Sequence, residues 1–451
     1  MNENLITPYQ QRRLRNKTMR ISILEGAFAI FVFGLQQVFY VPYLNAMGAG
    51  KLQIGIGVCL PPLMVGLVQI WMPSLLVRIK SYKKLVVSVT FVHGMCFLPF
   101  ALVYYFTPQH PIWPTIAAIA FSAVWVGMGV APWADWMSYV VPKRRIGTYF
   151  AKRSRILTAI QLVIAIISGR VLDLGADKVI YVFTAIWLVC FATRICSATC
   201  LIYYYEPPAI FNRPRNKTSF LEFTRRIFST SYGKFTLGSA MVSLGLNFAI
   251  PFYAVYMLND LKLTYTQYTI LQLMPIAAMI IAAGTWGMIC DSIGYVIPVR
   301  LAAVLLALPA LVWVITDNYW LLMINQIVYG IAFGGFQLTT FNYMIGSLGP
   351  TDRASNISYM TAINCICLSL GSFLGGLIGP YLPKITAYQL HSIFVLSSVI
   401  GIGAAVILQM VAVEKPPLRK FNLMQRLLFD PQLPLQIGFR RASSKTDRQT
   451  Q

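Results

Sequence analysis

Twelve continuous apolar runs, each about 19–27 residues long, follow one another along this chain. A helix of that length crosses the ~30 Å hydrocarbon core of a bilayer. Backbone groups inside lipid must be hydrogen-bonded within the protein, so only helices or a closed barrel can span it. The runs are continuous and do not alternate in polarity, which excludes barrel strands. The sequence therefore predicts an all-α membrane protein with twelve transmembrane helices.

Composition agrees with this class. Hydrophobic residues make up 57% of the chain and charged residues 11%, whereas soluble domains carry roughly 25% charged residues. The predicted spans are residues 21–44, 52–77, 84–106, 112–134, 154–174, 178–204, 235–257, 266–289, 297–315, 319–343, 356–380 and 388–412. The stretch GRVLDLGADKV supplies the only turn signal between the fifth and sixth spans.

The distribution of positive charge predicts the orientation of the helices. If the N-terminus is cytoplasmic, 31 of the 37 Lys and Arg fall on the cytoplasmic side and 4 fall in the outer loops. This asymmetry indicates cytoplasmic N- and C-termini. It also accounts for most of the net charge of +23. We therefore expect contact with membrane lipids and no binding of nucleic acid.

Motifs for other functions are missing from the sequence. It contains no Walker A, GxSxG or HExxH pattern and no paired catalytic carboxylates, so neither ATP hydrolysis nor another enzymatic activity is predicted. The eight cysteines fall inside or at the ends of predicted helices without metal-binding spacing. We interpret them as small buried hydrophobic residues, and we expect no metal and no cofactor.

A comparison of the two halves of the chain indicates an internal duplication. Shifting the sequence by 214 residues aligns Leu44 with Leu258, Asn45 with Asn259, Gln53 with Gln267, Pro61 with Pro275 and Ile79 with Ile293. The matches occupy equivalent places in each half, as expected for two parallel repeats. We predict an N-terminal six-helix bundle (1–205), a cytoplasmic linker (206–233), a C-terminal six-helix bundle (234–412) and a basic cytoplasmic tail (413–451).

The stretch GTWGMICDSIGY, at the inner end of the eighth span, carries a recognisable motif. Its Gly287-x-x-x-Asp291-x-x-Gly294 resembles the G-x-x-x-D-x-x-G signature of the major facilitator superfamily. The resemblance implies two pseudo-symmetric six-helix bundles that work by alternating access. It also implies a cytoplasmic gate in which Asp291 meets the positive start of the fifth helix, with basic residues nearby. The predicted gate residues are Gly287, Asp291, Gly294, Arg145, Arg153 and Arg353; a solvated loop aspartate without a gating role is the alternative.

The stretch APWADWMSYVVPKRRIGTYFAKRSR resembles a poorly characterised bacterial branch of the same superfamily. The matching positions are Trp133, Trp136, Met137, Val141, Pro142, Arg145, Gly147, Tyr149, Phe150 and Arg153. Ile146 departs from the pattern where a second arginine is usual. The resemblance implies a multi-pass protein of the bacterial inner membrane and supplies no substrate.

In the superfamily the first, fourth, seventh and tenth helices line a central cavity, which sorts the polar residues of the predicted spans. Amides and aromatic rings predominate there, and they suit a neutral or amphipathic solute that forms hydrogen bonds. The predicted cavity residues are Gln36, Gln37, Trp125, Gln161, Asn247, Tyr253, Gln326, Tyr329, Gln337 and Asn364. Taken singly, each could instead join two helices by a hydrogen bond.

Ionisable residues in the spans are few, and each has two interpretations. Glu25 could carry a proton near the cavity, or it could pair with Arg20 or another basic residue. Arg194 could snorkel to the cytoplasm or find a partner inside, with Glu25 a distant possibility. His93 is expected to be a hydrogen-bonded core residue. Three aspartates, Asp173, Asp177 and Asp260, are expected in solvent at the outer surface.

These observations together predict a monomeric secondary transporter for a small organic substrate, with coupling to protons through Glu25 as a further hypothesis. The alternative function is a non-transporting relative that serves as a membrane assembly factor or a sensor. The sequence leaves the substrate and the direction of transport undefined.

Overall fold

The computed structural model describes residues 8–79, 81–142, 146–207, 219–347 and 353–411. All regular structure in these ranges is helical, and twelve of the helical segments are long and apolar enough to cross a membrane. The predicted fold class is therefore confirmed. The elements are α1 (Pro8–Ala46), α2 (Lys51–Arg78), α3 (Tyr82–Phe106), α4 (Ile112–Val140), α5 (Ile146–Leu174), η3 (Ala176–Lys178), α6 (Val179–Ile202), α7 (Phe220–Arg225), α8 (Ser231–Val255), η5 (Tyr256–Asp260), α9 (Tyr265–Ile293), α10 (Val296–Ala307), α11 (Pro309–Ile315), α12 (Tyr319–Ser347), α13 (Arg353–Ile378), η6 (Gly379–Tyr381) and α14 (Leu390–Val411).

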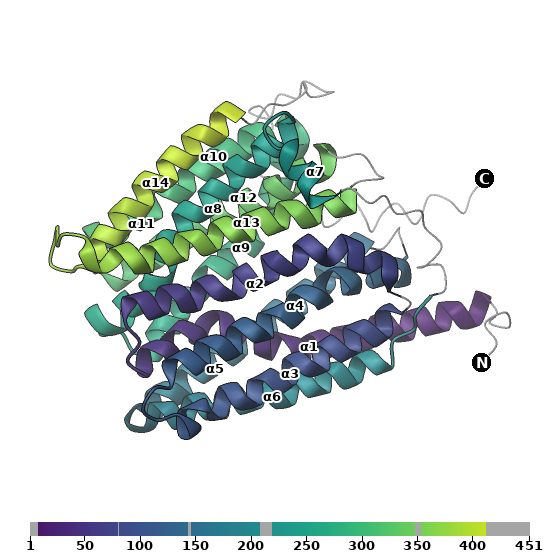
Figure 1. Cartoon of the computed structure of the whole chain (residues 1–451), viewed down its shortest axis with the longest axis horizontal. Coiled ribbons are helices and arrows are strands. Elements are labelled where there is room, and N and C mark those ends of the chain that lie inside the picture. Colours follow the sequence, from purple (N-terminus) through teal and green to yellow (C-terminus); the bar gives the residue numbers. More distant parts are fainter. Residues whose placement is uncertain (1–7, 80, 143–145, 208–218, 348–352, 412–451) are drawn as a thin grey trace, which may run out of the picture.

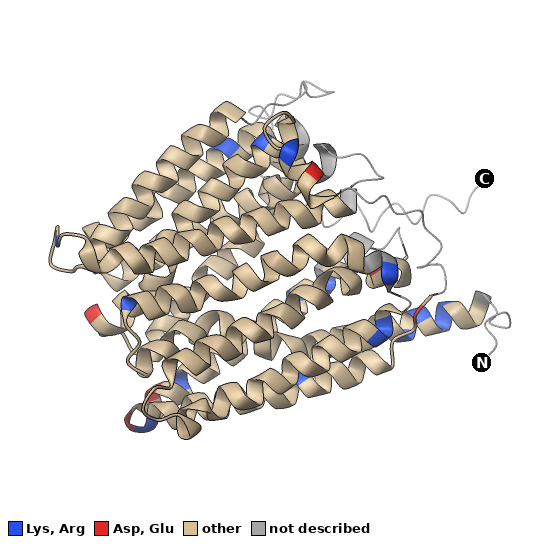
Figure 2. Ribbon diagram, viewed as in Figure 1, with Lys and Arg blue, Asp and Glu red and all other residues tan. Residues whose placement is uncertain are grey.

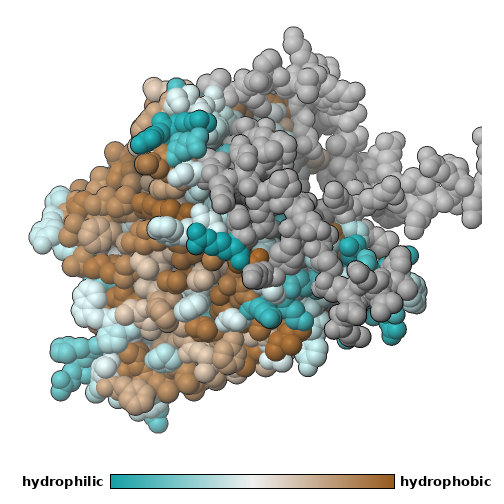
Figure 3. Space-filling view, turned by 45° about the vertical axis from the view of Figure 1, so that its right-hand side comes forward, coloured by the Kyte–Doolittle hydropathy of each residue, from teal (hydrophilic) through white to brown (hydrophobic). Residues whose placement is uncertain are grey.

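The spans agree with the apolar runs, with two differences in detail. The first helix begins at Pro8 and not near residue 21, because a polar segment can continue a helix beyond the membrane. The ninth span consists of α10 and α11, which are separated where Pro309 cannot continue the hydrogen-bond ladder. As expected for a lipid-facing surface, large apolar side chains such as Trp71 and Ile281 are exposed. Hydrophobic residues cover much of the face shown in Figure 3.

The helices form two groups that meet along α2 and α13 (Figure 1). Helices α1–α6 pack with one another, and α8–α14 form the second group. Between the groups, α2 contacts α13, α5 contacts α9 and α1 contacts α8. The four domain limits proposed above stay predictions, and residues 412–451 lie outside the described part of the chain.

The two ends of the molecule differ in charge. Lys and Arg gather toward the end at which α1 begins, which we call the terminal end (Figure 2). The opposite end, called the distal end below, holds Asn45, Lys51 and the short helices η3, η5 and η6. The predicted turn between the fifth and sixth spans lies there too, at Gly175 and η3.

Residues equated by the 214-residue shift have the same structural roles in the two halves. The Gln53 side chain accepts a hydrogen bond from the Gly50 N–H (2.9 Å) at the start of α2. Gln267 does the same for the Thr264 N–H (3.0 Å) at the start of α9. Each glutamine thus satisfies a backbone donor that the first turn of a helix leaves open. This equivalence supports the duplication inferred from sequence.

Candidate transport cavity and its charged neighbours

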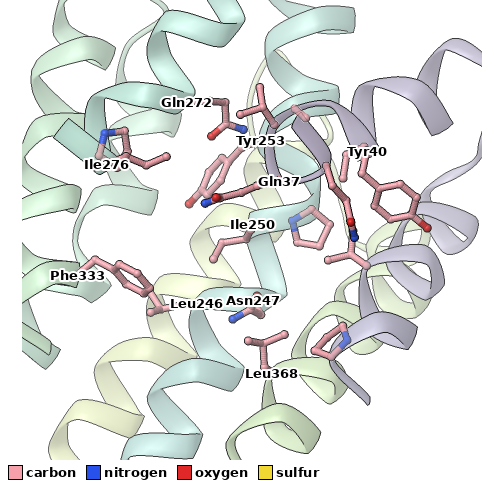
Figure 4. Close-up of a pocket in the computed structure, with 18 of the residues that line it drawn as sticks. Gln37, Tyr40, Leu246, Asn247, Ile250, Tyr253, Gln272, Ile276, Phe333 and Leu368 are labelled. Carbon is pink, nitrogen blue, oxygen red and sulfur yellow. The ribbon is translucent and has the colours of Figure 1, made fainter. Parts of the chain in front are cut away.

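A cavity of about 610 Å³ lies between the two groups of helices (Figure 4). Residues of α1, α2, α4, α8, α9, α11, α12 and α13 line it, and none of the described side chains of α5 does. Figure 4 shows Gln37, Tyr253 and Gln272 reaching into the same part of this space from three different helices. The volume is that of a small-molecule site.

Eight of the ten predicted cavity residues line it: Gln36, Gln37, Asn247, Tyr253, Gln326, Tyr329, Gln337 and Asn364. The other two do not. Gln161 is buried behind the lining, where its amide donates to the Gln37 side chain (3.3 Å). Trp125 lies on α4 against Phe121 and is not one of the lining residues.

The lining carries no charge. None of the described residues around the cavity is Asp, Glu, Lys, Arg or His. Its polar side chains are amides and hydroxyls, and aromatic rings of Tyr253, Tyr329 and Phe333 provide flat apolar surface. A buried ion would meet no counter-charge in such a site, at considerable cost. The chemistry of the lining suits an uncharged molecule.

Contacts at the distal end close the space between the helix groups. Asn45 on α1 and Asn259 on η5 donate hydrogen bonds to each other's amide oxygens (2.8 and 2.9 Å). These two residues are partners in the 214-residue repeat. The widened π-turn of η5 presents Asn259 to the first half of the chain.

Asp173 belongs to the same closure, contrary to its predicted place in solvent. Its carboxylate accepts hydrogen bonds from the backbone N–H groups of Tyr265 (2.6 Å) and Thr266 (3.0 Å) at the start of α9. A negative charge at a helix N-terminus also interacts favourably with the helix dipole. The sequence could not show this, because the partner helix lies 92 residues further along the chain.

Two glycines let α2 and α13 cross closely near the distal end. A Cβ added to Gly55 would lie 2.7 Å from the Gly376 Cα, and one on Gly376 would lie 2.9 Å from the Gly55 Cα. No larger residue fits at either position without separating the backbones. The helix groups are thus in direct backbone contact here.

The terminal end is different. A Cβ on Gly287 or Gly284 of α9 would meet nothing within 4 Å, so α9 is not closely packed at these two positions in this conformation. Gly294 ends α9 with φ of 85° and ψ of −174°, a backbone geometry that is essentially restricted to glycine. Among the described residues, the hydrogen bonds that join the two helix groups lie in the distal half.

Only some of the side chains in the predicted cytoplasmic gate belong to the described part of the chain. Arg145 and the side chains of Asp291 and Arg353 lie outside the described part of the chain. The Arg153 side chain is described, and it contacts Glu25 at 3.1 Å and covers the Trp133 ring at 4.7 Å. In this conformation Arg153 therefore lies in a network within the first half of the chain.

Glu25 is the centre of that network and does not line the cavity. Its carboxylate accepts hydrogen bonds from Arg153 (3.1 Å), Ser197 (3.0 Å) and Tyr204 (3.3 Å). Gly26 leaves room for Arg153, since a Cβ there would lie 2.6 Å from the guanidinium. Burial, and then the Glu25 charge, raises the pKa of the Tyr204 hydroxyl, which therefore remains a neutral donor.

Arg194 and His93 extend this network toward the cavity. Arg194 donates to the Ser197 hydroxyl (3.3 Å) and to His93 Nδ1 (3.0 Å), so Glu25 is reached through one serine. The predicted core position of His93 agrees with this geometry. The Phe33 ring lies 5.0 Å from the Arg194 guanidinium and also lines the cavity. One aromatic ring thus separates a buried cation from the cavity.

Sequence reasoning overlooked one amide of the cavity lining and one polar network at the distal end. Gln272 lines the cavity from α9, and its position as an amide inside a predicted span was a usable signal. A second network lies at the distal end, where Tyr256 donates to Asp317 (2.6 Å) and contacts His391 Nε2 (2.9 Å). These three residues are dispersed in sequence, and nothing in their spacing indicates that they meet.

Twelve spans in two groups around a polar cavity define a multi-pass membrane protein. The model of the Major Facilitator Superfamily matches residues 235–444. The match is confined to the second half of the chain. No curated protein matches the sequence.

Solved structures of transporters share the fold at low sequence identity. A variant of the nucleoside transporter NupG has a TM-score of 0.70 at 13% identity, covering 87% of this chain and 99% of its own. A bacterial homologue of the human lysosomal transporter Spinster, inward-facing and unoccupied, has a TM-score of 0.64 at 15% identity (88% and 97%). An inward-facing bacterial homologue of the iron transporter ferroportin has a TM-score of 0.61 at 13% identity (88% and 99%). Similarity at this level concerns the fold alone.

Proposed function

We propose that this protein is a secondary transporter that moves a small, neutral organic solute across a bacterial inner membrane by alternating access. The observation that carries the proposal is the uncharged, amide-rich cavity at the interface of the two helix groups. A site at that interface can open to one side when the groups rock about it. The excess of Lys and Arg supports a cytoplasmic terminal end, with the distal end outside.

In this proposal the structure represents the inward-facing conformation. The Asn45–Asn259 pair, the Asp173 cap and the Gly55–Gly376 crossing hold the outer side closed. The open surroundings of Gly287 correspond to a separated inner side. Transport then requires the distal contacts to break as the terminal end closes.

The rival function is an assembly factor or sensor that does not transport. A scaffold has no need for a polar cavity, whereas a transporter depends on one. Thermal stabilisation of the purified protein by a panel of metabolites, followed by uptake of the best-stabilising compound into proteoliposomes, tests the proposal. Stabilisation without uptake would favour a sensor, and a scaffold would show neither.

Proton coupling through Glu25 makes a separate prediction. Uptake of the best-stabilising compound should increase when a pH gradient is imposed, and Glu25→Gln should abolish that increase while leaving counterflow without a gradient. The carboxylate is the acidic member of a buried network that reaches the cavity wall through Arg194 and Phe33. Uptake that is indifferent to both the gradient and the substitution would remove the coupling hypothesis.

The inner gate makes another prediction. Asp291→Asn should slow turnover by about fivefold, the size of a charge–dipole interaction of ~1 kcal/mol, because the closed inner side would lose its contact with the start of α5. The variant should keep its thermal stability, since a Cβ added to Gly287, one turn earlier in α9, would meet nothing within 4 Å in the present conformation. Asp177→Asn, an exposed distal substitution, is the control. Normal turnover of Asp291→Asn would reject the gate.

A further inference from the structure

Three cavity amides of the second helix group each donate one N–H to a partner inside the protein. The Asn247 amide donates to the Ser243 carbonyl (2.8 Å), and the Gln326 amide donates to the Leu271 carbonyl (3.1 Å). A carbonyl oxygen can only accept, so these bonds fix which end of each amide is nitrogen. The amide oxygens are left as the free ends.

The orientation of the third amide, that of Gln272, follows from two consecutive hydrogen bonds. The Tyr268 hydroxyl donates its proton to the Val38 carbonyl (2.6 Å), so toward Gln272 it can only accept. The Gln272 NH₂ group supplies that hydrogen bond (3.2 Å). Its oxygen is therefore the free end as well.

The three oxygens belong to residues that line one cavity from three helices, α8, α9 and α12. In the described part of the chain none of them accepts a hydrogen bond, and none is a fully buried unsatisfied atom. One wall of the cavity thus offers hydrogen-bond acceptors. An acceptor wall selects ligands by the donors that they bring, because an occupant without donors would leave these oxygens unpaired and dehydrated.

We propose that the substrate is an uncharged molecule that presents several hydroxyl or N–H donors to the second helix group and a flat or apolar face to the aromatic rings. This inference rests on the proposed function and names its substrate class. An anion is disfavoured by three facing oxygens. An organic cation would find oxygens and rings but no carboxylate to balance its charge in the described lining.

The test uses matched compounds on the purified wild-type protein. Thermal stabilisation is measured with nucleosides, hexoses, methyl glycosides and inositols, each beside its fully O-methylated counterpart. O-methylation keeps the ring and the acceptors but removes the hydroxyl donors. We expect at least one hydroxylated compound to stabilise the protein and its O-methylated form to bind at least tenfold more weakly, as the loss of two or more hydrogen bonds would produce. Choline and alkylammonium ions form the cationic arm and should give no stabilisation.

Two variants test whether binding of the stabilising compound depends on the amide oxygens of Gln272 and Gln326. Gln272→Met and Gln326→Met keep the side-chain length and remove the oxygen, so each should weaken binding of the stabilising compound about tenfold. The control is Gln69→Met. Gln69 is equally an intramembrane glutamine whose amide donates to a main-chain carbonyl (Gly127, 3.3 Å), but it lies outside the cavity lining. The control should bind normally.

Four outcomes would overturn the inference: equal binding of the O-methylated compounds, preference for the cations, normal binding by both variants, and no stabilisation by any hydroxylated compound. Failure of the proposed function would appear elsewhere. A transporter with a different substrate class would still take up the compound that stabilises it, whereas a scaffold would show no uptake of any compound.

Discussion

Replacing Arg153 by methionine should destabilise the protein by about 3–5 kcal/mol, because it leaves Glu25 as a buried carboxylate without its ionic partner. The side chains of Arg153 and Glu25 are only 15% and 6% exposed. The substitution retains most of the apolar stem, so the loss measures mainly the charge. Thermal unfolding in nanodiscs, followed by tryptophan fluorescence, gives the comparison with wild type.

Arg226→Met is the matched control for this prediction. Arg226 also forms an ion pair, with Glu222 at 2.9 Å, but the two side chains are 64% and 48% exposed. An exposed helical pair of this spacing contributes less than about 0.5 kcal/mol. The same chemical change should therefore have almost no effect at position 226.

The double variant Glu25→Gln with Arg153→Met separates burial of a charge from loss of packing. Removing both charges should recover a substantial part of the stability lost by Arg153→Met alone, since no carboxylate is then left unpaired. If the stability losses of the two single variants simply add, the coupling free energy between Glu25 and Arg153 is zero. The ion pair would then not stabilise the protein.

The number and type of helices followed from sequence because each span must be long and apolar by itself. Equivalent residues of the two halves were also recognisable, since Gln53 and Gln267 keep one capping role after duplication. Such features are local, or they are repeated locally. They need no knowledge of how helices pack.

The cavity was predictable only in part. The superfamily resemblance indicated which helices face the centre, and eight amide or aromatic residues do line it. Gln161 and Trp125 do not, because the face that a helix turns to the centre depends on its rotation about its own axis. Amide periodicity in an almost wholly apolar helix does not fix that rotation.

Long-range polar contacts were predictable only in outline: the sequence offered pairing of Glu25 with a basic residue as one alternative, but it did not specify Arg153. Arg194 meets His93 across 101 residues of sequence, and Gly94 permits it because an added Cβ there would lie 3.3 Å from the arginine stem. The sequence predicts a solvated Asp173, because a carboxylate at a helix end is usually hydrated. Only the position of α9 reveals its actual partner.

The second large effect is expected at the distal end. Cross-linking Asn45→Cys to Asn259→Cys with a short bis-methanethiosulfonate should reduce turnover to the level of liposomes without protein, and reduction of the link should restore it. The wild-type amides are hydrogen-bonded to each other from opposite helix groups. A covalent link at this point keeps the distal ends together, and the outward-open state cannot then be populated.

A second cross-link, within one helix group, distinguishes loss of movement between the two helix groups from a general loss of flexibility. Tyr105→Cys and Thr184→Cys lie at the same end of the molecule, on α3 and α6 of one helix group, where the wild-type hydroxyls are 3.3 Å apart. If each group moves as a rigid body, a link between them leaves turnover unchanged. Full activity of the linked 45–259 protein would mean that the distal ends need not separate, and rocking about the central cavity would have to be abandoned as the mechanism. Loss of activity in both linked proteins would instead point to motion inside the first helix group, with the Glu25 network as the first place to look for it.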